Sequence, residues 1–225
     1  MSIDPVGSHF DNVAPDYDRW KIKAHHYYAS LKANVAEVVP PGRRVLEVGC
    51  ATGDILASLL PADGVGMDIS PAMIELASKK HPQLRFEVHD LMNGPLGERF
   101  EFVVAADVAE HVPDLDLCME AMAGMLTQEG LLVLVTANPA WAPILHVAER
   151  LHMKMPEGDH TWRSREDLAS SARRAGLVER SFTRSLLVPK DVWGLRVLDS
   201  AGWAASIRQR GGLMQRAVFE HSGAA

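Results

Sequence analysis

Two glycines, four residues apart, lie between two segments in which apolar residues recur at different intervals. In the stretch RRVLEVGCATGDILASLL, residues 43–60, Gly49 and Gly53 bracket a turn from a predicted strand into a predicted helix. Glycine lets a backbone approach a ligand closely, so such a turn is typical of a binding site. The turn lacks the G-x-G-x-x-G pattern of dinucleotide sites and the Gly-Lys-Ser/Thr of phosphate loops. It therefore favours a nucleoside-like ligand without phosphates.

Two aspartates end the next predicted strands. Asp68 lies 19 positions after Gly49, where an acidic side chain can bind both hydroxyls of a ribose. Asp90, in FEVHDL, ends the third strand and lies within reach of a purine edge. Taken alone, Asp68 could be a helix cap and Asp90 a loop residue. Together, in order and each at a strand end, they predict a nucleoside site.

A histidine follows the fourth predicted strand, at the edge of the sheet where the predicted ligand binds. This is His111, in the segment DVAEHV. Imidazole titrates near pH about 6.5, which suits a general base that takes a proton from a hydroxyl. The alternative is that the Glu110–His111 pair only stabilises the loop. We predict His111 as the catalytic residue.

The elements that must position these residues alternate along the chain. Strands are predicted at residues 44–48, 65–69, 84–88, 102–106, 131–137, 177–182 and 214–219. Helices are predicted at residues 20–39, 54–60, 72–80, 115–126, 144–151 and 164–176, with Ser70 and Ser164 as caps. This alternation indicates an α/β fold with a mostly parallel sheet and helices on both faces. Ligands of such sheets bind at the carboxyl ends of the strands.

One domain is the simplest organisation of the 225 residues. We expect residues 1–39 to form an N-terminal helical arm that acts as a lid. Residues 40–137 would form the cofactor-binding core, and residues 138–225 the substrate side and the final strands. His160 and Trp162 lie in an irregular segment that could form a substrate wall, although Trp162 could equally belong to a small satellite core.

Composition narrows the class of protein. The chain has 23 basic and 29 acidic residues, so its net charge of −6 argues against a nucleic-acid partner. Two isolated cysteines fit a reducing compartment. The first twenty residues lack a signal-peptide pattern, and no apolar run is long enough to cross a bilayer. We therefore expect a cytoplasmic monomer or homodimer without a membrane span.

Four segments resemble the successive motifs of class I S-adenosylmethionine-dependent methyltransferases. They are VLEVGCATGD, GVGMDIS, FEVHDL and FEFVVAADVAEHVPD, in that order along the chain. The resemblance extends to the small-molecule, ubiquinone-biosynthesis-like members, whose arm over the cofactor is similar to FDNVAPDYDRW. Ala51 departs from the pattern, because most relatives have a middle glycine there.

The resemblance implies a Rossmann-like, seven-stranded sheet and a role for each matching residue. Tyr17 belongs to the arm, and Glu47 with the turn residues Gly49, Cys50, Ala51 and Gly53 would hold the methionine end of S-adenosylmethionine. The ribose would be bound by Asp68 and the adenine by Ile69, Asp90 and Leu91, while Ala106 would face the sulfonium.

The resemblance also implies the chemistry. In ubiquinone-biosynthesis relatives the positions of Asp107, Glu110 and His111 can bind a divalent cation, but many class I relatives carry Glu-His here without one, so we expect no metal. The predicted function is methyl transfer to a small-molecule acceptor, through a hydroxyl oxygen. Alternatives are methylation of nitrogen or carbon, a nucleotide-dependent oxidoreductase, and a non-catalytic S-adenosylmethionine-binding protein.

Overall fold

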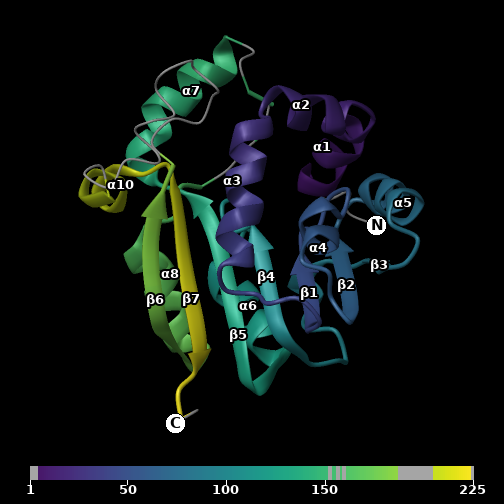
Figure 1. Ribbon diagram of the computed structural model, residues 1–225, viewed down its shortest axis with the longest axis vertical. Coiled ribbons are helices and arrows are strands. Elements are labelled where there is room, and N and C mark those ends of the chain that lie inside the picture. Colours follow the sequence, from purple (N-terminus) through teal and green to yellow (C-terminus); the bar gives the residue numbers. More distant parts are fainter. Residues whose placement is uncertain (1–4, 152–153, 156–157, 159–160, 187–204, 224–225) are drawn as a thin grey trace.

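The computed structural model describes residues 5–151, 154–155, 158, 161–186 and 205–223. Its centre is one seven-stranded sheet in the order β3-β2-β1-β4-β5-β7-β6 (Figure 1). The strands are β1 (Arg44–Val48), β2 (Asp63–Asp68), β3 (Arg85–Val88), β4 (Phe100–Ala106), β5 (Leu126–Ala137), β6 (Leu177–Ser185) and β7 (Met214–His221). β7 runs antiparallel to both of its neighbours, β5 and β6, whereas β1 to β5 pair in parallel. The predicted mostly parallel, Rossmann-like α/β sheet is confirmed.

Helices cover both faces of the sheet. They are α1 (Pro5–Val13), α2 (Tyr17–Lys23), α3 (His25–Ala36), α4 (Asp54–Ser58), α5 (Pro71–Lys80), α6 (Leu115–Gly124), α7 (Ala142–Arg150), α8 (Arg165–Arg174) and α10 (Ala205–Gly211). Leu31 of α3 and Leu56 of α4 pack with Val45 on one face. On the other face, Met119 of α6 packs with Leu46. Successive residues of β1 thus point to opposite faces, as the period of a strand requires.

The predicted helix over residues 20–39 is wrong in one respect, because the chain forms two helices there. Ala24, with φ −109° and ψ 27°, separates α2 from α3. Lys21 pairs with Asp54 of the core, whereas Leu31 and Val35 of α3 pack on the sheet, so the chain has to turn between them. The apolar spacing continues through the bend and therefore hides it.

The fifth strand also begins earlier than predicted, at Leu126 instead of Leu131. Leu126 pairs with Phe100, and the register shifts before Phe102 pairs with Leu131. Exposed polar residues between those two pairs interrupt the apolar pattern of the sequence. The strand is nevertheless continuous, because its backbone pairing does not require apolar side chains.

The arm made of α1, the short 3-10 turn Ala14–Asp16 and α2 lies at the end of the sheet where the parallel strands finish (Figure 1). Ser70 caps α5 as predicted, its Oγ accepting from the Met73 amide at 3.1 Å. The same hydroxyl donates to Asp11 of α1 at 2.5 Å, which ties the arm to the core. In the described part of the chain, no helix has the length and apolar character needed to span a bilayer.

Candidate active site

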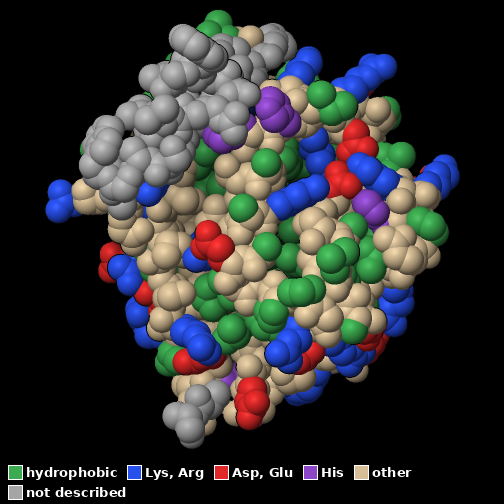
Figure 2. Space-filling view, viewed as in Figure 1, with side chains coloured by type: hydrophobic (Ala, Val, Ile, Leu, Met, Phe, Trp, Pro, Cys, Tyr) green, Lys and Arg blue, Asp and Glu red, His purple; other side chains and the backbone are tan. Residues whose placement is uncertain are grey.

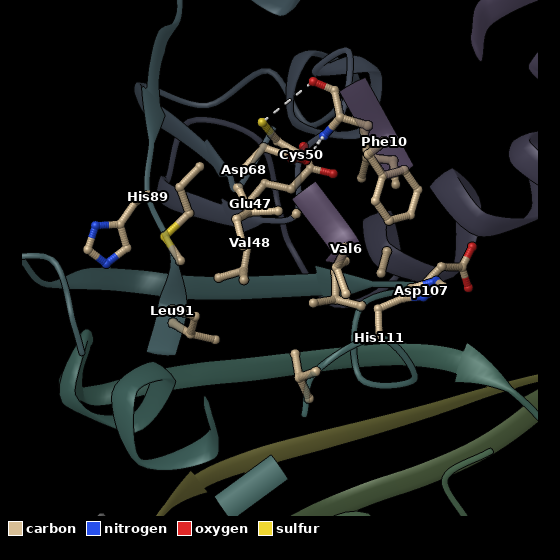
Figure 3. A pocket seen from close by; sticks show the side chains of 18 of the residues that line it. Val6, Phe10, Glu47, Val48, Cys50, Asp68, His89, Leu91, Asp107 and His111 are labelled. Atoms are coloured by element: carbon tan, nitrogen blue, oxygen red, sulfur yellow. Dashed lines mark hydrogen bonds between the residues drawn. The ribbon is translucent and has the colours of Figure 1, made fainter. Parts of the chain in front are cut away.

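A cavity lies at the carboxyl ends of β1 to β4, beneath the N-terminal arm (Figure 3). Ten of the eleven predicted cofactor residues line it, and so does the predicted base. These lining residues are Tyr17, Glu47, Gly49, Cys50, Ala51, Asp68, Ile69, Asp90, Leu91, Ala106 and His111. Figure 3 shows Glu47, Cys50 and Asp68 together on one side of the cavity, with Asp107 and His111 apart from them.

The glycine turn is shaped by the protein's own packing. Gly49 and Gly53 have φ of 65° and 75°, in the left-handed region that favours glycine. A Cβ on Gly49 would lie 2.4 Å from Val108 Cγ2, and one on Gly53 would lie 2.6 Å from Phe86 Cζ. Gly53 is the one predicted cofactor residue that does not line the cavity. Its place in the structure is at the contact between the turn and β3.

The Ala51 backbone is also left-handed, with φ of 46°. That conformation costs a non-glycine residue about 1–2 kcal/mol. The Ala51 amide is fixed in place by the Asp68 carboxylate, which accepts its hydrogen at 2.8 Å. The turn therefore keeps its left-handed conformation with alanine at this position.

Asp68 joins the turn to the following helix. Its Oδ2 accepts from the Ala51 amide, and its Oδ1 accepts from the Ser70 amide at 2.9 Å. The residue is 8% exposed, and this burial raises the pKa of Asp68, although hydrogen bonds from the backbone amides of Ser70, Ala51 and Ile69 oppose the rise. A carboxylate has about four lone-pair sites, so Asp68 can accept a further hydrogen bond from a donor in the cavity, such as a ribose hydroxyl.

Glu47 lies deeper, at the base of the turn, and is 1% exposed. Burial raises the pKa of Glu47 to about 8, against the opposing effects of the Leu56 amide and of Lys21. Its Oε2 accepts the Leu56 hydrogen at 2.9 Å. Glu47 is therefore mostly protonated at neutral pH in this structure, and a cation placed beside it would favour loss of that proton.

We expect Glu47→Gln to flatten the dependence of folding stability on pH. Because the pKa of Glu47 is raised on folding, the folded state holds a proton that the unfolded chain loses between pH 4.5 and about 8. The wild type should thus lose stability over this interval, by on the order of 4 kcal/mol. Urea unfolding at pH 5, 6.5 and 8 measures the difference, with exposed Glu129→Gln as control. A gap between Glu47→Gln and wild type that does not change with pH would contradict the expectation.

The end of the cavity beyond β3 suits an adenine ring. Asp90 Oδ1 accepts from the Met92 amide at 2.8 Å, while Oδ2 takes no hydrogen bond from any described residue. Ile69, Leu91 and Met92 supply apolar surface on the same part of the cavity wall. An acceptor oxygen between apolar side chains matches a flat base that carries an amino group.

A charged network holds the arm against the core. Lys21 of α2 pairs with Asp54 and donates to Thr52 Oγ1 at 3.0 Å, and Lys80 of α5 reaches Asp18 at 2.7 Å and Asp54 at 2.9 Å. Burial alone would raise the pKa of Asp54, but Lys21 and Lys80 outweigh it and hold that pKa well below its ordinary value. Figure 2 shows acidic, basic and histidine side chains gathered where α2 meets α4 and α5.

The three residues after β4 that resemble a cation site point to different surroundings. Asp107 accepts from the Tyr27 hydroxyl at 2.8 and 2.9 Å, and the His111 ring packs edge-on against Phe10 with centroids 5.4 Å apart. Glu110 is buried and accepts from Thr136 Oγ1 at 2.8 Å, and it does not line the cavity. Among the described residues, no three His, Cys, Asp or Glu side chains converge as a metal site would require.

The structure adds cavity residues to the predicted set. The arm contributes Val6, Phe10 and Lys21, and α3 contributes Tyr28, Leu31 and Lys32. Burial and the neighbouring Tyr28 raise the pKa of Tyr17 well above its ordinary value, so its hydroxyl stays protonated as a donor. Trp162 is half-buried with its ring 5.8 Å from that of His146, and His160 lies outside the described residues. The resemblance of FDNVAPDYDRW predicts an arm over the cofactor, but helical spacing alone does not say which further side chains of residues 1–39 reach the cavity.

Comparison with known proteins places the chain among methyltransferases. The family model described as "Methyltransferase domain" matches residues 20–180. The ubiquinone biosynthesis O-methyltransferase of Chelativorans sp. is 30% identical over 197 residues, which cover 83% of this chain and 73% of that protein. The Bradyrhizobium diazoefficiens protein of the same name is 33% identical over 130 residues, 54% of this chain and 51% of that protein. The chain thus aligns with about half the length of several curated relatives.

Solved structures share the fold at low identity. A methyltransferase of Thermotoga maritima, titled a possible histamine N-methyltransferase, has a TM-score of 0.75 and 17% identity, covering 96% of this chain and 100% of that chain. The magnesium protoporphyrin IX methyltransferase of Synechocystis, solved with bound S-adenosylhomocysteine, has a TM-score of 0.65 and 18% identity, covering 96% and 98%. These likenesses support the fold alone.

Proposed function

The chain belongs to the class I S-adenosylmethionine-dependent methyltransferases, and from this premise we propose that it transfers a methyl group from S-adenosylmethionine to a hydroxyl of a small molecule. The observation that carries the proposal is the buried Asp68 carboxylate, held between the glycine turn and the cavity. It is an acceptor of ribose hydroxyls in a site without pyrophosphate-binding features. The residues present therefore fit this cofactor.

The predicted cofactor residues bind different parts of the cofactor along the cavity. Asp68 accepts from the ribose hydroxyls, and Asp90 accepts from the adenine amino group through Oδ2. Ile69 and Leu91 pack against the adenine ring. When bound, the cofactor supplies a methyl group already activated on a sulfonium. The protein's task is to align the acceptor behind that methyl and to exclude water.

His111 acts on the acceptor in this proposal. It follows β4 and, like Ala106, lines the cavity. Ala106 is the residue that we propose faces the sulfonium. A ring nitrogen of His111 takes the proton from the acceptor hydroxyl as the oxygen attacks the methyl group. Phe10 packs against the ring and limits the orientations that the imidazole can adopt.

The arm acts as the lid of the single domain. Val6, Phe10 and Tyr17 line the cavity from above, and the ion pairs of Lys21 and Lys80 hold the arm down. A cavity covered in this way suits a small acceptor better than a nucleic acid. Cytoplasmic location and a monomeric or homodimeric state stay predictions.

Transfer to oxygen is tested with S-adenosylmethionine carrying a labelled methyl group. Catechol and 2-aminophenol are the probes, because they differ in one position, hydroxyl or amine. Methyl ethers from both compounds are the expected products, identified by mass spectrometry. Labelling of the 2-aminophenol nitrogen alone would contradict an oxygen acceptor and favour the N-methyltransferase alternative.

A further inference from the structure

The side chain of Arg163 binds the loop that carries His111. This loop, residues 107–113, connects β4 to α6. Arg163 Nε donates to the Ala109 carbonyl at 3.1 Å, and its Nη2 donates to the Val112 carbonyl at 3.0 Å. The two carbonyls lie on either side of His111 in the sequence. Because the donors of a guanidinium are fixed in one plane, this pair of hydrogen bonds restricts the backbone on both sides of the histidine.

The charge of Arg163 is directed at these carbonyls and not at an acid. The residue is half-buried, and among the described residues no carboxylate forms an ion pair with it. An ionised donor strengthens its hydrogen bonds to neutral acceptors. The Arg163 backbone is itself attached to the sheet, since the buried Gln215 of β7 donates to its carbonyl at 2.5 Å. The guanidinium therefore extends toward the loop from a fixed point.

A third hydrogen bond joins the same two segments. The Thr161 amide donates to the Glu110 carbonyl at 2.7 Å. The Glu110 side chain is fixed separately, because Thr136 Oγ1 donates to it at 2.8 Å. Neither contact involves the Arg163 side chain. A substitution of Arg163 should therefore leave the loop attached at Glu110 while releasing the backbone on both sides of His111.

The loop begins in a backbone conformation that needs such support. Asp107 has φ of 55°, in the left-handed region that disfavours residues with a side chain. Such a conformation persists where surrounding contacts hold it. The Tyr27 hydroxyl donates to the Asp107 carboxylate at the start of the loop, and the His111 amide donates to the Val108 carbonyl at 2.9 Å. Arg163 supplies the contacts that follow along the loop.

We propose that Arg163 is a positioning residue that orients His111 for proton transfer. This inference rests on the proposed function, because it takes His111 as the base. Among the described residues that line the cavity, Arg163 is absent, so it acts through the loop and not on a ligand there. Misplacing a catalytic group by about 1 Å can lower a rate about a hundredfold. Loss of the two hydrogen bonds should thus lower turnover and leave cofactor affinity unchanged.

The test is a double-mutant cycle read out as methyl transfer to catechol. Arg163→Met removes the donors but keeps an extended side chain, and we expect kcat to fall about ten- to hundredfold with the dissociation constant of S-adenosylmethionine within about twofold of wild type. In the His111→Gln background the same change should cause no further loss, because the base is already absent. Arg165→Met is the matched control, since Arg165 pairs with Glu179 instead of the loop, and it should leave kcat unchanged in both backgrounds.

The outcomes separate this inference from the proposed function. Absence of methyl transfer by the wild type, or full turnover in His111→Gln, would overturn both. Full turnover in Arg163→Met, with a loss in His111→Gln, would overturn the inference alone. Equal losses from Arg163→Met in the two backgrounds would also overturn it, because they would show a general structural effect.

A second variant keeps the charge and checks the hydrogen-bond geometry. Arg163→Lys presents one ammonium in place of the planar fork, so it cannot reproduce both contacts with the loop. We expect it to show most of the loss of kcat seen in Arg163→Met, again only where His111 is present. Thermal unfolding checks that each variant is folded, and Arg163→Lys repeats the cycle if Arg163→Met is not. Wild-type kcat in Arg163→Lys would contradict positioning through the two carbonyls.

Discussion

Replacing Asp68 by alanine is expected to weaken S-adenosylmethionine binding about ten- to hundredfold. The carboxylate would accept charge-assisted hydrogen bonds from the ribose, and such bonds contribute roughly 1.5–3 kcal/mol. In the structure both oxygens also accept backbone amides, from Ala51 and Ser70. Asp68→Asn keeps the shape and one acceptor oxygen, so we expect an intermediate loss. Calorimetric titration with S-adenosylmethionine measures both variants.

A control for Asp68 lies on the same strand. Asp63 begins β2 at its opposite end, is exposed and pairs with Arg44. Asp63→Asn should leave cofactor affinity unchanged, and thermal unfolding checks that all three variants are folded. Unchanged affinity in folded Asp68→Ala would show that the carboxylate only fixes the turn, which would contradict its assignment to the ribose.

Replacing His111 by alanine is expected to lower turnover at least a hundredfold and to change the dissociation constant of S-adenosylmethionine by less than about twofold. General-base catalysis contributes about 10²–10⁴ in rate. His111 lies apart from Glu47 and Asp68 (Figure 3), on the side of the cavity where we propose that the acceptor binds. His111→Gln keeps a polar side chain of similar length but removes the base. We therefore expect the same loss of turnover in both variants, measured as methyl transfer to catechol.

Comparing the effect of His111→Ala on turnover with its effect on S-adenosylmethionine affinity distinguishes a general base from a residue that only positions the loop. His221, at the end of β7 and outside the cavity, is the control, and His221→Ala should equal wild type. Recovery of turnover in His111→Gln would indicate that the side chain only positions the loop. Equal losses of turnover and cofactor affinity in His111→Ala would lead to the same conclusion.

The sheet and much of the cavity could be predicted because their signals are local in sequence. Val45–Val48 alternates between two buried faces, and Ser70 with Pro71 marks the start of α5. The predicted cofactor residues follow strand ends, and in a parallel sheet these ends meet at one edge. The order of these motifs along the chain does not depend on tertiary packing, so it can be read from a single sequence.

The remaining features depend on contacts between segments far apart in the chain. The bend at Ala24 follows from the pairing of Lys21 with Asp54, 33 residues later. The motif predicts that Gly53 belongs to the ligand-binding turn, whereas in the structure Gly53 lies against Phe86, a contact that no local pattern encodes. Whether a lysine on a helix faces solvent, an acid or a cavity is likewise decided by packing, so Lys32 carried no signal in the sequence.

We propose that the cavity binds S-adenosylmethionine and not a dinucleotide. Calorimetric titration of the wild-type protein with S-adenosylmethionine, and with NAD under the same conditions, distinguishes the two ligands. We predict micromolar binding of S-adenosylmethionine and no measurable binding of NAD, because the turn lacks a pyrophosphate site. Binding of NAD without binding of S-adenosylmethionine would contradict the account of the turn and of Asp68.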